Sequence, residues 1–276
     1  MNYLGINLWN WVPALSRDCV GLPTRAAEMG FTAVELPMTT TQPIPELEQE
    51  IRDLGLGVTL CAALGPGKDL SSFDPQVRAY TMEYLTQCLD AGARIGASVL
   101  AGPLYAGGGK RHALPPGEKE REWELAVTGL QELSRRAGER GIKLAIEPLC
   151  RYRTSVVNTV DQGLAMIRDV DSPNLGLHYD TFHACLEEAD LIASLEKALD
   201  SGKVYHFHAC ANNRGGPGEG ILPWDRVLPL LKEKNYPGHV TMETFAPGGL
   251  DASWIHVHPQ PDEVARRGID FLRRYF

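Results

Sequence analysis

The sequence lacks any apolar stretch of about 18 residues, the length that a helix needs to cross a bilayer. It also lacks a run of Lys or Arg, and its formal net charge is −8. A chain with this charge is repelled on average by nucleic acid and by anionic membrane surfaces. We therefore expect neither a membrane protein nor a nucleic-acid-binding protein.

Cysteine is scattered, and the six thiols form no Cys-x-x-Cys pair. A disulfide framework is typical of small secreted domains, so in a chain of 276 residues we expect free, buried thiols. The first residues, MNYLGINLWNW, show neither the basic start nor the cleavage site of a signal peptide. These features predict a cytoplasmic protein whose fold begins with these residues.

A nucleotide-binding GxGxxG turn is absent, and so is a linker rich in Pro, Ser or Gly. The chain contains instead short β-type runs, separated by amphipathic segments with apolar residues at helical spacing. The clearest predicted helices are 123–140 and 261–276. The predicted strands are Tyr3–Leu8, Ala33–Leu36, Gly57–Cys61, Ser98–Ala101, Lys143–Glu147, Leu175–Asp180, Val204–His208 and Val240–Glu243.

Eight strand–helix units in this length predict an α/β fold, a (β/α)8 TIM barrel that forms a single domain over residues 1–276. A doubly wound open sheet is the alternative, but it usually has fewer strands and a glycine-rich phosphate turn. Two loops are expected at the same mouth of the barrel, one around residues 106–117 and one at 246–260.

Each of the four late strands ends in a residue that can bind a metal: Glu147, Asp180, His208 and Glu243. Active sites of such barrels lie at the carboxyl ends of the strands, so these side chains would converge. Three buried carboxylates repel each other and lose hydration, and a divalent cation between them offsets that cost. Three carboxylates and one imidazole suit Mn²⁺ first, with Co²⁺ or Mg²⁺ as alternatives. We expect His206 to be a hydrogen-bonded histidine inside the barrel.

Several strings of the sequence match one known group of proteins along most of the chain. They are DTFH at 180–183, NRGGPGEGILPW at 213–224, and shorter matches at 5–6, 35, 65–66 and 70–72. With the order Glu147, Asp180, His208, Glu243, they resemble the ketose 3-epimerases of the D-tagatose and D-allulose (psicose) type. These enzymes belong to the xylose-isomerase-like sugar isomerase/epimerase superfamily.

The resemblance implies a metal-dependent epimerase that removes and returns the proton at C3 of a ketose through a metal-bound cis-enediolate. Glu147 and Glu243 would be the acid–base pair on the two faces of C3. His183 and Arg214 would hydrogen-bond the developing charge on the substrate oxygen O2. The resemblance also implies a small sugar substrate and a homodimer or homotetramer.

Some positions depart from the pattern of the epimerases. Where they carry a second Glu six residues after the first ligand, this chain has Arg153, and the loop at 106–109 is Ala-Gly-Gly-Gly instead of containing an aromatic residue. A guanidinium prefers carboxylate or phosphate. We therefore expect Arg153 to contact a substrate other than a plain short ketose, one that is acidic, phosphorylated or bulkier, such as a 3-keto-glycoside. We also expect Trp9, Phe245 and Glu35 at the substrate site.

Other activities could use the same residues. An aldose–ketose isomerase of the hydroxypyruvate type would move the proton between C1 and C2, and a lyase or dehydratase would expel a group beside the carbonyl. A DNA-repair endonuclease of the same superfamily is disfavoured, because the third and fourth strands end without the extra His ligands of its trinuclear zinc site. A non-catalytic sugar-binding barrel is disfavoured by the complete ligand set.

Overall fold

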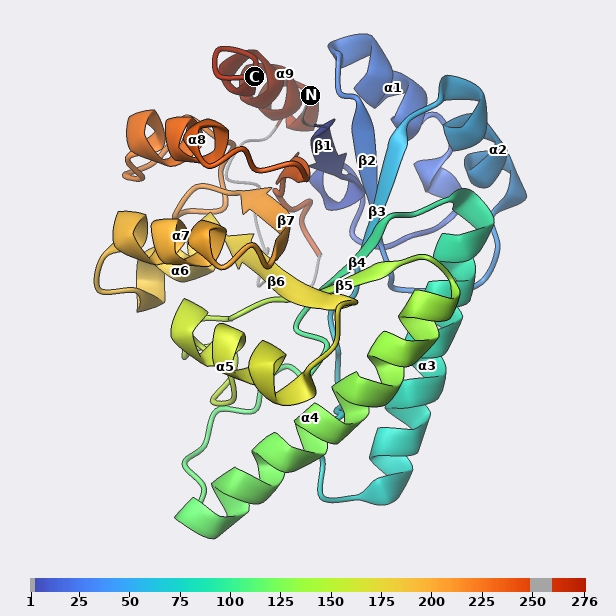
Figure 1. Ribbon diagram of the computed structural model, residues 1–276. Helices are drawn as coiled ribbons and strands as arrows, with labels where there is room; N and C mark the ends of the chain where they lie inside the picture. The colour runs from blue at the N-terminus through green and yellow to red at the C-terminus, as the bar shows by residue number, and fades with distance from the viewer. Residues whose placement is uncertain (1–2, 249–259) are drawn as a thin grey trace.

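The computed structural model describes residues 3–248 and 260–276. Its eight parallel strands follow one another around a closed barrel, in which β1 pairs with both β2 and β8 (Figure 1). The predicted (β/α)8 barrel is confirmed, and every strand begins and ends within one residue of its predicted bounds. The strands are β1 (Tyr3–Asn7), β2 (Ala33–Pro37), β3 (Gly57–Cys61), β4 (Val99–Gly102), β5 (Lys143–Ile146), β6 (Leu175–Asp180), β7 (Val204–Ala209) and β8 (His239–Met242).

Helices surround the barrel and connect successive strands (Figure 1). The connection from β6 to β7 carries two of them, and short 3-10 turns, η1 (Leu8–Asn10) and η2 (Arg17–Cys19), follow β1. Among the described residues, no helix is both long and apolar enough to span a bilayer. The helices are α1 (Leu22–Met29), α2 (Pro45–Leu54), α3 (Pro75–Ile95), α4 (Pro116–Glu139), α5 (Val160–Val170), α6 (Thr181–Glu187), α7 (Leu191–Asp200), α8 (Trp224–Glu233) and α9 (Pro261–Leu272).

Two predicted helices differ from the structure at one end. Helix α4 begins at Pro116 rather than at residue 123, because proline suits the first helical position, where an N–H has no intrahelical partner. Helix α9 ends at Leu272 rather than at Phe276, since the N–H of Tyr275 bonds the Leu272 carbonyl in a tighter, 3-10-type turn. The predicted loop at 246–260 lies mostly outside the described residues.

All six cysteines are free, and five of them are buried, which confirms the prediction of free thiols.

Polar residues fill part of the barrel interior, where apolar side chains usually dominate. The strand register aligns Asn7 with Glu35 and Glu35 with Thr59, so three neighbouring strands carry a polar residue at one level. The fully or almost fully buried polar side chains of this interior include Asn7, Glu35, Thr59, His178, His206 and His208.

Candidate active site

A cavity of about 240 Å³ opens at the carboxyl-terminal end of the barrel. Seven of the residues predicted for the site line it, whereas Asp180, His208 and Glu35 do not. The rings of Trp9 and Phe245 lie 5.3 Å apart in its wall. The lining residues are Trp9, Cys61, Ala63, Leu64, Gly65, Pro66, Pro103, Gly108, Gly109, Glu147, Leu149, Arg153, His183, Arg214, Glu243 and Phe245.

Glu147 directly follows β5 and is buried. Its Oε2 lies 3.8 Å from His178 Nδ1, and its Oε1 lies 4.0 Å from His183 Nε2. Burial raises the pKa of the Glu147 carboxyl well above its usual range, and the charges of Asp180 and Glu243 raise it further. The negative charge of Glu147 is therefore unfavourable unless a cation lies near it.

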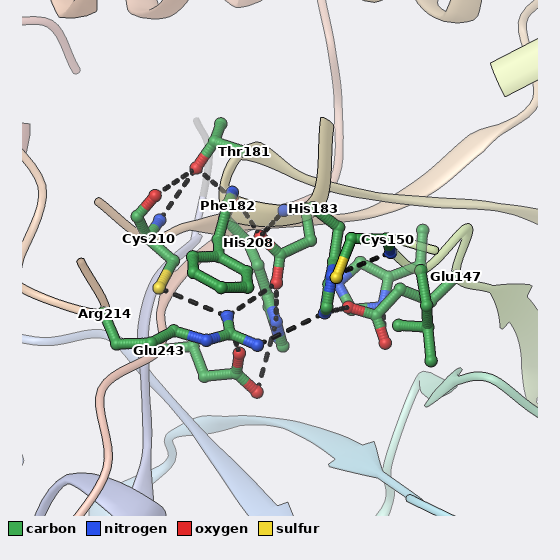
Figure 2. Close-up of polar contacts among 12 residues, drawn as sticks. Glu147, Cys150, Thr181, Phe182, His183, His208, Cys210, Arg214 and Glu243 are labelled. Atoms are coloured by element: carbon green, nitrogen blue, oxygen red, sulfur yellow. Dashed lines mark hydrogen bonds and ion pairs between the residues drawn. The ribbon is translucent and has the colours of Figure 1, made fainter. Parts of the chain in front are cut away.

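Asp180 ends β6 and caps helix α6, since its Oδ1 accepts hydrogen bonds from the N–H groups of Phe182 (2.6 Å) and His183 (3.4 Å). Its Oδ2 lies 3.2 Å from Arg214 Nη1, and the same nitrogen lies 3.1 Å from Glu243 Oε2 (Figure 2). Burial raises the pKa of Asp180, but Arg214, His208 and His183 together outweigh burial and hold this pKa well below its usual range. Asp180 is thus an ionised carboxylate beneath the cavity.

The side chains around Asp180 fit a divalent cation. Asp180, His208 and Glu243 each offer a ligand atom, and these atoms lie within 4.8 Å of one another. His208 Nδ1 has no hydrogen-bond partner among the residues that the structure describes, and it lies 3.8 Å from Asp180 Oδ2 and 3.5 Å from Glu243 Oε1. The fourth predicted ligand, Glu147, groups with Asp180 and His183 instead. Carboxylate oxygens with one imidazole nitrogen are a donor set for a borderline-hard divalent metal.

Glu35 lies beneath this cluster and not in the cavity wall. Its Oε1 lies 2.7 Å from His208 Nε2 and accepts a hydrogen bond from Asn7 Nδ2 at 2.8 Å. Its Oε2 accepts from Thr59 Oγ1 at 2.9 Å and lies 2.7 Å from His206 Nε2, the interior contact expected for that histidine. We expected Glu35 at the substrate site, but it is not among the residues that line the cavity. Its carboxylate instead holds His208 so that Nδ1 faces Asp180 and Glu243.

His183 lies in helix α6 and presents a neutral ring to the cavity. Its Nδ1 accepts a hydrogen bond from the Cys150 N–H at 3.1 Å, so the ring hydrogen belongs on Nε2. Burial lowers the pKa of His183 to about 3, with Arg214 among the groups that lower it further. His183 Nε2 lies 3.2 Å from Arg214 Nη2 (Figure 2), so two N–H groups converge on one part of the cavity.

The loop after β7 fixes Arg214. The Arg214 N–H donates to the Ala211 carbonyl at 2.9 Å and the Ala211 N–H donates to the Gly215 carbonyl at 3.0 Å, in a tight turn where Arg214 has a φ of 62°. This left-handed conformation costs a non-glycine residue about 1 kcal/mol or more. The guanidinium carbon lies 3.7 Å from the ring centre of Phe182 and 5.0 Å from that of Phe245. These aromatic faces stabilise the cation and fix its position.

Part of the cavity wall is formed by backbone alone. The Gly108 N–H donates to the Leu64 carbonyl at 2.7 Å, and the Gly109 N–H donates to the Arg153 carbonyl at 3.1 Å. Gly109 has a φ of 88°, a conformation that glycine adopts without strain. The glycine-rich loop after β4 is therefore joined to the loops after β3 and β5, beside Arg153.

Three residues that position the functional side chains were not identified from the sequence. Asn7 and Thr59 bind the two oxygens of Glu35, and Thr181 Oγ1 donates to the Cys210 carbonyl at 2.7 Å, which joins the ends of β6 and β7 (Figure 2). The sequence does contain a signal for Asn7 and Thr59, because both are polar residues that align with Glu35 on the strands next to β2. Neither side chain carries a charge, so neither stood out as a candidate for the site.

Comparison with known proteins places this geometry in a family. The model of the xylose isomerase-like TIM barrel family matches residues 23–275. An L-ribulose 3-epimerase of Mesorhizobium japonicum is 31% identical over 221 residues, which are 79% of this chain and 73% of that protein. A D-psicose 3-epimerase of Agrobacterium fabrum is 30% identical, with 90% of each chain covered.

Solved structures agree with the sequence relatives. The crystal structure of a D-allulose 3-epimerase from Methylomonas sp. in complex with D-allulose superposes with a TM-score of 0.91 at 25% identity, over 100% of this chain and 97% of that chain. The resemblance predicted from the residues is thereby confirmed. The chain belongs to the xylose isomerase-like TIM barrel family.

Proposed function

We propose that this protein is a divalent-metal-dependent sugar epimerase that inverts a ketose at C3. The observation that carries the proposal is the placement of Glu147 and Glu243 in the wall of one cavity, directly after β5 and β8, with Asp180 and His208 on the strands between them. Inversion at one carbon needs two acid–base groups that reach opposite faces of it. The relatives named as ketose 3-epimerases support the same reaction.

Glu147, Asp180, His208 and Glu243 would hold the cation, with Mn²⁺ proposed first and Co²⁺ or Mg²⁺ as alternatives. When bound, the cation supplies Lewis-acid polarisation of the substrate carbonyl at C2. Glu35 would keep the hydrogen of His208 on Nε2 and leave Nδ1 as the ligand atom.

The carboxylates of the cavity would transfer the proton at C3, and its hydrogen-bond donors would stabilise the charge that develops on the substrate. One of Glu147 and Glu243 would take the proton from C3, and the other would return a proton to the opposite face. His183 Nε2–H and the Arg214 guanidinium would donate hydrogen bonds to the substrate oxygen O2 as negative charge develops there. A single domain over residues 1–276, a cytoplasmic location and a homodimer or homotetramer stay predictions.

Proton exchange in D₂O tests the proposal most directly. The protein is incubated with Mn²⁺ and a panel of ketoses, and NMR follows the C3 hydrogen and the appearance of a second diastereomer. We expect exchange at C3 that stops with EDTA and returns with Mn²⁺. Exchange confined to C1 and C2 would instead identify an aldose–ketose isomerase. Loss of a substituent beside the carbonyl would identify a lyase, and either result would contradict the proposal.

A further inference from the structure

Lys110 lies in the loop between β4 and α4, and it is not among the described residues that line the cavity. Its Nζ lies 2.9 Å from Asp69 Oδ2 and 2.8 Å from Glu122 Oε1. The same nitrogen donates a hydrogen bond to Ser71 Oγ at 2.7 Å. Asp69 and Ser71 belong to the loop after β3, and Glu122 belongs to α4. One ammonium group therefore joins the loops after β3 and β4 to a helix of the outer layer (Figure 1).

The ion cluster around Lys110 is buried, and its charges balance. The Glu122 side chain is fully buried, and those of Lys110 and Asp69 are only 16% and 17% exposed. Glu122 Oε2 also lies 2.8 Å from Lys119 Nζ, so the cluster contains two lysines and two carboxylates. A buried ion is stable only beside partners of opposite charge, and removing one partner leaves the others uncompensated. The cluster therefore fixes the Lys110 side chain in one position.

Lys110 directly follows the part of the cavity wall that has no side chains. Gly108 and Gly109 line the cavity, and their N–H groups are bonded to carbonyls of the neighbouring loops. The Lys110 carbonyl accepts a hydrogen bond from the Ser155 N–H at 2.7 Å, which joins this stretch to the loop after β5. The Lys110 side chain is the first one after the two glycines, so it is placed to limit how far they can move.

The same ammonium group holds the facing part of the wall. Residues 64–66 line the cavity from the loop after β3, shortly before Asp69 in the chain. Asp69 is fixed within that loop, since its Oδ1 accepts hydrogen bonds from the N–H and the hydroxyl of Ser71 at 2.8 and 2.7 Å. Lys110 therefore binds the loops of both stretches, 64–66 and 108–109, from behind the cavity. We call these two stretches the uncharged wall.

We propose that Lys110 is a positioning residue that sets the shape of the uncharged wall, and with it the fit of the part of the keto-sugar that lies beyond the reacting carbons. The inference rests on the proposed function and deepens it, because it assigns substrate fit to a side chain that does not touch the substrate. Lys110 acts through main chain and not on the proton at C3. Its loss should therefore weaken substrate binding and leave the chemical step intact.

Amide hydrogen exchange of the Mn²⁺-loaded protein tests the anchoring without any substrate. Lys110→Met keeps most of the side-chain length but removes the ammonium group. Peptides that contain Gly108, Gly109 and Ser155 should then exchange about 10- to 100-fold faster by mass spectrometry, the value of hydrogen bonds to a charged group. Lys110→Arg, which keeps the charge, should restore part of the protection. Unaltered exchange of these peptides, or an equal increase in all barrel strands, would overturn the proposal.

A paired variant makes the same test if Lys110→Met alone does not fold. Lys110→Met combined with Asp69→Asn removes one carboxylate together with the ammonium, and Glu122 keeps Lys119 as its partner. No buried charge then lacks a partner within the cluster. We expect the same faster exchange at 108–109 and 155, and exchange as slow as in the wild type would contradict the anchoring.

Steady-state kinetics show whether the anchoring sets substrate fit. For the ketose that reacts best, Lys110→Met should raise KM by about 10-fold, with kcat and Mn²⁺ affinity retained. The matched control is Lys234→Met at the end of α8. Lys234 also binds two carboxylates, Glu196 at 3.0 Å and Asp200 at 2.7 Å, but it is not among the described residues of the cavity wall. An unchanged KM in Lys110→Met, or an equal rise in Lys234→Met, would contradict the assignment.

The two measurements separate this inference from the proposed reaction. If no ketose shows C3 exchange, the proposed function fails, and amide exchange still decides whether Lys110 holds the uncharged wall. If C3 exchange occurs and Lys110→Met lowers kcat while KM is retained, the reaction stands and the assigned role of Lys110 is wrong.

Discussion

The two halves of the barrel contribute different kinds of residue to one cavity. Strands β1–β4 and their loops supply uncharged side chains and bare backbone, such as Trp9, Ala63 and Gly108. Among the described residues of the wall, the carboxyl and guanidinium side chains all come from the loops that follow strands β5–β8: Glu147, Arg153, Arg214 and Glu243. The comparison suggests that one half performs the chemistry and the other shapes the space in which a substrate lies.

The largest expected effect comes from removing a carboxylate of the charged half. Glu147→Gln and Glu243→Gln should each lower kcat by about 10²- to 10⁴-fold, because a positioned acid or base contributes that much. NMR of epimer formation measures the rates, and Mn²⁺ content is checked in each variant. Glu46→Gln, on the exposed surface of α2, is the matched control. An unchanged kcat in either cavity variant would contradict the assignment of that glutamate as an acid or base.

A change in β2 tests whether the division between the halves is complete. Glu35→Gln should weaken Mn²⁺ binding by about 10- to 100-fold, since an outer-shell carboxylate orients the ligand histidine. Titration of the metal-free protein with Mn²⁺ measures this without any substrate. Thr59→Val removes one hydrogen bond to Glu35 but leaves the Glu35–His208 contact, so it should have a smaller effect. Unaltered metal affinity in Glu35→Gln would show that β5–β8 hold the metal unaided.

A larger side chain in the cavity wall should change KM, and so the choice of substrate, more than it changes kcat. Ala63→Leu adds carbon atoms to the cavity from the uncharged half, so KM for the larger keto-sugars should rise by about 10-fold while metal affinity is retained. Ala113→Leu makes the same change on the exposed loop before α4 and serves as the control. A loss of kcat with no change in KM would contradict the division of roles.

The smallest effect concerns the end of β8 away from the site. His239 stacks on Tyr3, with ring centres 4.8 Å apart, and burial lowers the pKa of His239 to about 4. In the unfolded chain this histidine binds a proton below its ordinary pKa of about 6.5, whereas in the folded chain it does so only below about pH 4. The free energy of unfolding therefore falls as the pH is lowered through this window. Urea midpoints at several pH values in this window should change less in His239→Gln than in wild type or in His112→Gln. An unaltered pH dependence in His239→Gln would show that His239 does not cause this loss of stability at low pH.

The fold could be predicted from the sequence because parallel barrel strands are short buried runs between helical repeats, and all of them begin and end close to their predicted bounds. The ligand-type residues at the ends of β5–β8 were predictable for the same reason. The role of Glu35 was not, because strand alternation shows which way a side chain faces but not which neighbours fill its hydrogen bonds. Its partners Asn7 and Thr59 lie more than 20 residues away on either side and meet it only through strand register.

The hydrogen bonds of the glycine loop bear on how this cavity can change during evolution. Gly108 and Gly109 are attached to the neighbouring loops through their own amide hydrogens and the carbonyls of Leu64 and Arg153. These bonds involve no side chain, so the side chains at positions 64 and 153 can be exchanged without detaching the wall. A lineage could therefore acquire a new substrate by single substitutions while the reacting carboxylates stay where they are.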